Sequence, residues 1–198
     1  MEVCVADTLT KKEQTHQRML DAASASFRAN GYAGIGVDGI AKAAGVTSGA
    51  FYAHFGSKGG AFDAALKAGL DEVMAAIPQF RAEHGKGWLE AFADYYLSKA
   101  HRDDLSGGCA MTALSLEVVR ANGQVHAAYE DGMATIAGLV AEGLAGGTSD
   151  ERSARAWVML STLIGGLTTA RAVESNALAD KIAASVKDAA IVAAGDVA

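Results

Sequence analysis

The stretch from Gly36 to Lys58 reads GVDGIAKAAGVTSGAFYAHFGSK, and its pattern predicts two short helices joined by a tight turn. In the first helix, apolar or small residues recur at positions i, i+3, i+4 and i+7, which form one buried face; they are Val37, Ile40, Ala41 and Ala44. Gly45 supplies the positive φ that ends this helix. Thr47 and Ser48 carry the hydroxyl groups that cap the next one.

The second helix of this stretch has one apolar face and one small, polar face. Phe51 and Phe55 lie four residues apart and are expected to point inward. The remaining residues include no acid, and they are Ser48, Gly49, Ala50, Tyr52, Ala53 and His54. Small side chains allow a helix to approach base edges, while hydroxyl groups and free N–H groups reach phosphates. The pattern therefore favours a helix-turn-helix motif that enters the major groove, and the alternative is an ordinary αα-hairpin of a helical bundle.

The run from Ile40 to Lys58, IAKAAGVTSGAFYAHFGSK, resembles the tetracycline-repressor (TetR) family of bacterial one-component regulators. The resemblance extends over roughly residues 12–72. It implies an all-α fold, with an N-terminal three-helix DNA-binding domain and a C-terminal helical domain for ligand binding and dimerisation. It further implies a homodimeric repressor that leaves palindromic operator DNA when a small effector binds. The expected division is a flexible tail over residues 1–9, a helix-turn-helix domain over 10–56 and a ligand-binding and dimerisation domain over 57–198.

The resemblance also implies which residues contact DNA. The matching positions, for bases, nearby backbone or phosphates, are Val37, Asp38, Thr47, Ser48, Gly49, Ala50, Tyr52, His54 and Lys58. Three residues depart from the family pattern: Gly36 replaces a hydroxyl cap, Asp38 stands where a base-reading side chain can occur, and Ala50 lacks a hydroxyl. A carboxylate repels phosphate, so Asp38 is expected either to accept from a cytosine amino group or to face away from the DNA.

Composition indicates a helical protein without a membrane span. The hydrophobic fraction is 51%, charged residues make up 20%, and there is one proline among 198 residues. No apolar run is long enough to cross a bilayer, and the start lacks the order of a signal peptide, so we expect a cytoplasmic location and no membrane partner. The net charge of −6 is divided unevenly, +1 in residues 1–60 and −7 in residues 61–198. This asymmetry orients the N-terminal end toward DNA.

Further helices are predicted from apolar spacing, capping residues and breakers. The expected ranges are 10–30, 57–77 ending before Pro78, 87–102, 109–121, 123–144, 149–173 capped by Ser149 without a capping box, and 178–194. The first is expected to begin with a capping box of Thr10 and Glu13 and to bury an apolar stripe of Met19, Ala23 and Phe27. An apolar or aromatic effector is expected to bind among large side chains of these helices. The candidate lining is Trp88, Phe92, Tyr96, Cys109, Met111, Leu114, Trp157 and Leu160.

The sequence offers little that points to catalysis. The two cysteines and five histidines lack metal-ligand spacing, and no nucleophile, phosphate-binding or dinucleotide motif is present. We therefore expect no enzyme activity, no metal and no cofactor. One alternative is a redox- or electrophile-sensing repressor, because Cys109 follows two glycines at a predicted helix start that would favour its thiolate. Another is a helical enzyme or scaffold that keeps the motif only as structure.

Overall fold

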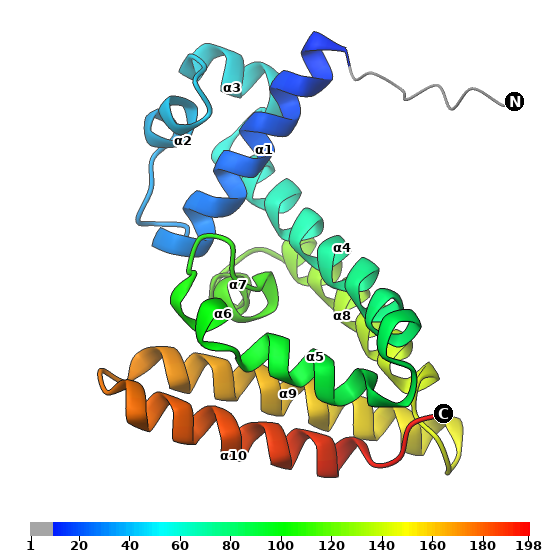
Figure 1. Cartoon of the computed structure of the whole chain (residues 1–198). Coiled ribbons are helices and arrows are strands. Elements are labelled where there is room, and N and C mark those ends of the chain that lie inside the picture. The colour runs from blue at the N-terminus through cyan, green and yellow to red at the C-terminus, as the bar shows by residue number, and fades with distance from the viewer. Residues whose placement is uncertain (1–9) are drawn as a thin grey trace, which may run out of the picture.

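The chain folds into helices throughout residues 10–198, which are the residues that the computed structural model in Figure 1 describes. The expected tail over residues 1–9 lies outside them. The helices are α1 (Lys11–Asn30), α2 (Val37–Ala43), α3 (Ser48–Phe55), α4 (Lys58–His84), the 3₁₀-helix η1 (Gly85–Gly87), α5 (Trp88–Leu97), α6 (Lys99–Asp103), α7 (Ala110–Val119), α8 (Gly123–Glu142), α9 (Ser149–Ala172) and α10 (Asn176–Ala194). The predicted all-α fold class is confirmed. None of the helices in the described part of the chain has the length and apolar character needed to cross a membrane.

The N-terminal helices, α1 to α3, gather at one end of the molecule around a small aromatic core (Figure 1). The start of α1 is fixed by the predicted capping box, in which the Glu13 N–H donates to Thr10 Oγ1 and the Thr10 N–H donates to Glu13 Oε2. The predicted stripe of α1 is buried, and its Phe27 ring meets Phe62 of α4 edge to face at 5.4 Å. This contact joins the N-terminal helices to α4.

Helix α4 is longer than the sequence predicts. It was expected to end at Ile77, yet it continues through Pro78 to His84. A proline inside a helix removes one hydrogen bond and costs about 3 kcal/mol. Packing of the next turn offsets this cost, because the Phe80 ring lies 5.5 Å from that of Phe92 and 5.7 Å from that of Tyr95. Tertiary contacts thus override the local preference.

The helix expected over residues 87–102 is instead two helices that meet at Ser98. The Ser98 N–H ends α5 by donating to the Tyr95 carbonyl (3.2 Å), and its hydroxyl accepts from the His101 N–H (3.1 Å) at the start of α6. A serine hydroxyl competes for backbone groups in this way, which makes it a common helix boundary. The break turns α6 and its side chains away from the axis of α5.

The start of α9 also differs from the prediction. Thr148, not Ser149, is the cap, and a capping box does form. The Thr148 hydroxyl accepts from the Glu151 N–H (3.2 Å), and the Glu151 carboxylate accepts from the Thr148 N–H (2.7 Å). The prediction that no capping box forms here was wrong because it started one residue too late.

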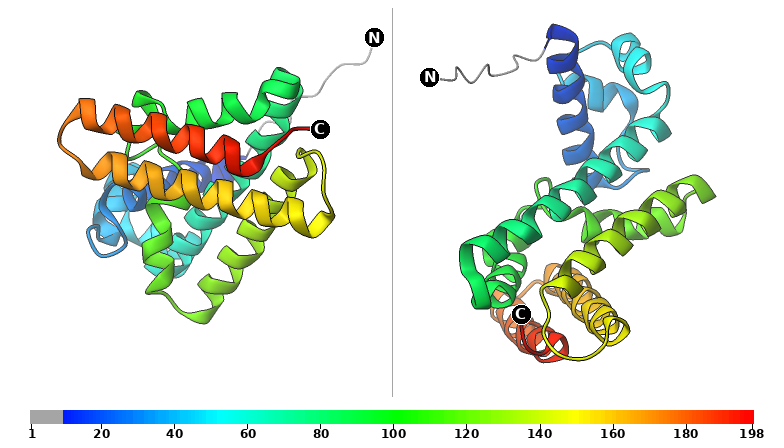
Figure 2. Two further views of the ribbon diagram at one scale, coloured as in Figure 1. Left: turned by 90° about the horizontal axis from the view of Figure 1, so that it is seen from below. Right: turned by 90° about the vertical axis from the view of Figure 1, so that its right-hand side faces the viewer.

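Helices α9 and α10 form an antiparallel pair across the far end of the molecule, and Figure 2 shows them from below with no other element covering them. Their contact depends on Gly166, where an added Cβ would lie 2.3 Å from Val186 Cγ1 of α10. At the neighbouring Gly165, an added Cβ would meet nothing within 4 Å. Gly166 therefore serves packing within the chain, while Gly165 lies open on the outer surface.

Candidate DNA interface and ligand pocket

The turn between α2 and α3 has the geometry of a helix-turn-helix motif. Gly45 has a φ of +67°, as predicted, and the Val46 N–H donates to the Ala41 carbonyl (3.0 Å) to close the turn. Thr47 caps α3 by accepting the Ala50 N–H (3.2 Å). The Phe51 side chain is completely buried beneath α3. These contacts fix α3 on the core and leave its opposite face to solvent.

Asp38 faces the start of α3. The Ser48 hydroxyl donates to Asp38 Oδ1 at 2.5 Å, and Ser48 is the first residue of α3. The carboxylate thus holds the hydroxyl that was expected to read DNA. Because the Ser48 proton is engaged by Asp38, its oxygen is left to act as an acceptor, which suits an amino group on a base edge.

His54 and Lys58 have partners within the chain. His54 Nδ1 lies 3.3 Å from Nδ1 of His16 on α1, and the His16 ring packs 5.1 Å from that of Phe55. Lys58 Nζ lies 4.4 Å from the centre of the Tyr32 ring. Sequence reasoning missed His16, because nothing local in the sequence pairs it with a residue 38 positions away.

The nine expected DNA-contact residues differ in exposure but gather on α2, α3 and the start of α4. The exposed ones are Asp38, Thr47, Gly49 and Tyr52; the half-buried ones are Val37, Ser48, Ala50, His54 and Lys58. The Tyr52 side chain is 51% exposed although it is large and aromatic. Such a ring on an uncovered helix face, beside small residues, is suited to contact a partner surface.

A pocket of about 80 Å³ lies among α4, α5, α6 and the loop before α7. Three expected residues line it, namely Phe92, Tyr96 and Cys109. Four others are core residues that do not line it: Trp88, Met111, Leu114 and Leu160. Trp157 is 40% exposed and lies on α9 away from the pocket. Apolar spacing identifies a buried face, but it does not distinguish core packing from a cavity wall.

The remaining lining residues were missed by sequence reasoning: Gly69, Glu72, Val73, Ala76, Tyr95, His101, Gly107, Gly108 and Ala110. Most are small or lie on α4, on which no lining residue was expected. His101 adds polar chemistry to this wall. Its Nε2 accepts the Cys109 N–H (3.0 Å), so in the neutral ring the proton resides on Nδ1. Burial, together with the charge of Arg171, lowers the pKa of His101 and keeps the ring neutral.

His101 Nδ1 is buried without a hydrogen-bond partner among the described residues. Tyr96 has its hydroxyl engaged with that of Thr112 at 2.8 Å, and burial raises its pKa well above the ordinary value. The pocket wall thus combines aromatic rings with neutral polar groups. The Nδ1–H donor of His101 lies near the Tyr95 backbone without a well-formed hydrogen bond, so it fits an effector that carries an acceptor oxygen.

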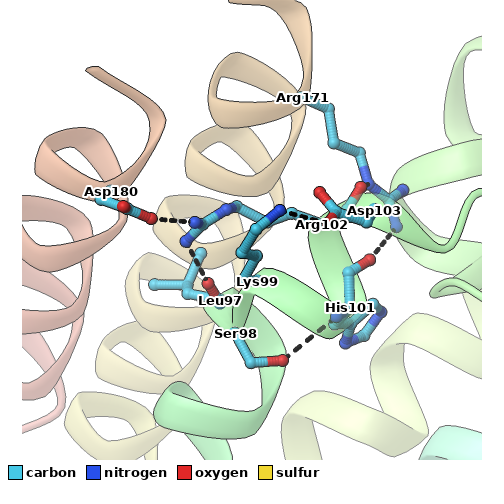
Figure 3. A network of polar contacts seen from close by, with 8 residues as sticks. All are labelled: Leu97, Ser98, Lys99, His101, Arg102, Asp103, Arg171 and Asp180. Atoms are coloured by element: carbon cyan, nitrogen blue, oxygen red, sulfur yellow. Dashed lines mark hydrogen bonds and ion pairs between the residues drawn. The ribbon is translucent and has the colours of Figure 1, made fainter. Parts of the chain in front are cut away.

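Two arginines connect this wall to α9 and α10, as Figure 3 shows. Arg171 of α9 donates from Nη2 to the His101 carbonyl (2.7 Å) and from Nε to the Arg102 carbonyl (3.2 Å). The Arg102 guanidinium donates to the Leu97 carbonyl (2.8 Å) and forms an ion pair with Asp180 of α10. The short α6 is therefore anchored to both of the last helices.

Cys109 lies at the start of α7, as expected, but its environment opposes a thiolate. Its side chain is buried, and this burial raises the pKa of the Cys109 thiol. Desolvation of the charged form outweighs the helix start that was expected to favour it. The structure therefore argues against the electrophile-sensing alternative.

We predict slow alkylation of Cys109 in the folded protein. In a Cys4→Ser background, which removes the other cysteine, iodoacetamide should label Cys109 at least tenfold more slowly than it labels the urea-unfolded chain at pH 8. The folded-state rate should rise only at pH values above the ordinary range of a thiol, because the raised pKa delays ionisation. Mass spectrometry of timed samples measures both rates. Equal labelling in the two states would restore the sensor hypothesis.

Comparison with known proteins gives a family match in the N-terminal helices. Residues 19–65 match the family model described as "Bacterial regulatory proteins, tetR family". The HTH-type transcriptional repressor SCO4008 of Streptomyces coelicolor is 31% identical over 84 residues, which are 42% of this chain and 43% of the relative. The aligned part of the chain therefore spans less than half the length of this curated relative.

Solved structures resemble about nine tenths of the chain. A TetR-family regulator from Agrobacterium tumefaciens superposes with a TM-score of 0.75 at 17% identity, covering 90% of this chain and 98% of the other. Another from Cytophaga hutchinsonii gives a TM-score of 0.73 at 19% identity, covering 93% and 96%. At these identities the likeness shows the fold, including the helices beyond the matched motif.

Proposed function

Because this chain belongs to the tetR family of bacterial regulatory proteins and is a transcriptional regulator, we propose that it is a repressor that binds palindromic operator DNA as a homodimer. A small apolar or aromatic effector releases it. In this proposal residues 10–56 form the DNA-binding domain and residues 57–198 the domain for the effector and the dimer. The protein works in the cytoplasm and needs neither catalytic activity nor a cofactor.

The outer face of α3 is the observation that carries this proposal. It is small and uncharged apart from His54, its backbone is fixed by the Thr47 cap, and Tyr52 stands exposed on it. Ser48 contributes an acceptor to a base edge, and Tyr52 reaches base or backbone. Lys58 and the free nitrogen of His54 contribute to phosphate binding. No residue of α3 carries a negative charge that would oppose the duplex.

The outer surface of α9 and α10 supports the homodimer. Large apolar side chains are exposed there, including Trp157, Val158 and Leu178. The open Gly165 allows a partner helix to approach α9 closely, which compensates for its cost of about 1 kcal/mol in a helix interior. In the proposed dimer these two helices pair with those of the partner as a four-helix bundle, and the two-fold axis requires a palindromic operator.

The pocket beside His101 supports effector binding. Phe92, Tyr95 and Tyr96 present aromatic rings, and the unpaired His101 Nδ1–H offers one donor. We propose that the effector is a ring compound with a carbonyl or similar acceptor oxygen. The pocket, of about 80 Å³, must enlarge to receive it. Displacement of bound DNA by a panel of aromatic ketones and their oxygen-free analogues tests this class.

We predict that DNA binding depends steeply on salt and on Lys58. The proposed function is tested by a gel shift with the promoter region next to the protein's own gene. The log–log slope of affinity against salt should be about −0.9 per phosphate neutralised, and Lys58→Ala should make the slope of a dimer shallower by about 1.8. Lys86→Ala, which removes an exposed charge in η1 outside the proposed DNA and dimer surfaces, is the matched control and should leave the slope unchanged. Affinity that stays flat between low and physiological salt would contradict the proposal.

A further inference from the structure

A second pocket, of about 200 Å³, lies where the N-terminal helices meet the rest of the chain. Its walls come from the loop after α1, the first turns of α4, the end of α7 and the start of α8. The side chains that define its chemistry are Tyr32, Phe62, Asp63, Glu117, Arg120 and Val125. None of them belongs to the pocket beside His101.

One wall of this junction pocket is aromatic. The Tyr32 and Phe62 rings meet edge to face with centroids 5.4 Å apart. The Lys58 ammonium already lies 4.4 Å from the Tyr32 ring centre, so this ring is placed to attract positive charge. Val125, which is 5% exposed, adds an apolar side chain to the lining.

Asp63 gives the junction pocket an incompletely satisfied carboxylate. Its Oδ1 is buried without a hydrogen-bond partner, and Asp63 forms no ion pair within residues 10–198. Burial raises the pKa of Asp63, as expected when a carboxylate lacks a counter-charge. A buried acceptor of this kind gains from any donor that reaches it, and gains most from a cationic one.

The other charges leave the lining acidic. Glu117 is half-buried, and its Oε1 lies against Gly31, where an added Cβ would be only 2.7 Å from it. Arg120 is turned back to its own helix, since its Nη1 donates to the Leu116 carbonyl (3.0 Å). The lining therefore carries two carboxylates and one guanidinium, and the guanidinium is engaged at the end of α7.

We infer that the junction pocket binds an organic cation that carries an aromatic ring, such as an arylalkylamine. The ammonium group supplies the missing partner of Asp63, and the ring packs against Tyr32 and Phe62. Because the walls belong to both the N-terminal helices and α7–α8, an occupant contacts both and fixes their separation. This site is additional to the proposed effector pocket, and its test needs no DNA.

The test compares 2-phenylethylamine with 2-phenylethanol, which has a similar shape and no charge at neutral pH. Isothermal titration of the full-length protein should show at least tenfold tighter binding of the amine. Asp63→Asn keeps the size of the side chain and should abolish this difference. Glu130→Gln removes an exposed acid of α8 and is the matched control, which should retain the difference.

Gly59→Leu locates the binding in the junction pocket. Gly59 lines this pocket, and an added Cβ there meets only ordinary contacts, 3.6 Å from Ser57 Oγ and 3.9 Å from the Tyr32 hydroxyl. Leucine also favours the helix more than glycine does, so the variant should fold. It should fill the pocket and lower amine affinity at least tenfold. Parent-like amine binding by this variant or by Asp63→Asn would overturn the inference, as would equal binding of amine and alcohol to the parent.

Discussion

Replacing both Trp157 and Val158 with glutamate should convert the protein to a monomer and weaken operator binding at least a hundredfold. These side chains are 40% and 53% exposed on α9, so the change should leave the fold intact. Two carboxylates placed on the proposed interface would face their symmetry mates without counter-charges. A hundredfold loss corresponds to about 2.7 kcal/mol. This is no more than the expected free-energy cost of burying unpaired charges at the centre of an interface.

Sedimentation velocity and the gel shift measure the two parts of this prediction. Leu116→Glu is the control, because Leu116 is 60% exposed and belongs to α7, which is not part of the proposed interface. It should leave both the mass and the affinity near those of the parent. A Trp157→Glu, Val158→Glu protein that remains dimeric would place the interface elsewhere.

Removal of Asp180 should destabilise the protein more than removal of its partner Arg102. The Arg102 side chain is 8% exposed, whereas that of Asp180 is 64% exposed. Asp180→Ala therefore leaves a nearly buried cation with only the Leu97 carbonyl, at an expected cost of about 3 kcal/mol. Arg102→Met leaves a solvated carboxylate and one unpaired carbonyl, and should cost about 1–2 kcal/mol.

Urea denaturation at one fixed protein concentration measures this asymmetry, since dimerisation makes the apparent stability depend on concentration. Lys99→Met is the control. It removes one side of the exposed Lys99–Asp103 pair, which should contribute about 0.5 kcal/mol or less. A larger loss for Arg102→Met than for Asp180→Ala would show that helix anchoring, not the unpaired charge, dominates.

Local sequence signals predicted much of the fold. The Thr10 capping box, the positive φ of Gly45 and the buried Phe51 each depend on residues within one or two turns, and each is found. The errors occur where contacts between residues far apart in the sequence determine where a helix ends. Pro78 stays inside α4 because Phe80 packs on α5, a contact that no local pattern reveals.

The sites were less predictable than the helices. The family resemblance supplied the expected DNA-contact residues around α3, and these stay a prediction. The pairing of Ser48 with Asp38 could not be predicted, because it depends on how α2 and α3 cross. The pocket lining was mostly missed, because a cavity arises where packing is incomplete, and small residues such as Gly69 and Gly108 carry no hydrophobic signal. His101 lines the pocket because the chain breaks at Ser98 and begins α6, the helix that carries His101.

Because α4 continues through Pro78, its length determines how far a small rotation of the helix moves its Lys58 end. Its 27 residues span about 40 Å at roughly 1.5 Å per residue. A tilt of about 5° around the His84 end would move the Lys58 end by about 3.5 Å, which is close to the rise of one base pair. Because Lys58 follows α3 almost directly, such a tilt in each half of the proposed dimer would shift both recognition helices by one step along their half-sites. Under the proposed function, a small rotation of α4 caused by an effector would therefore be enough to take the dimer out of register with its operator.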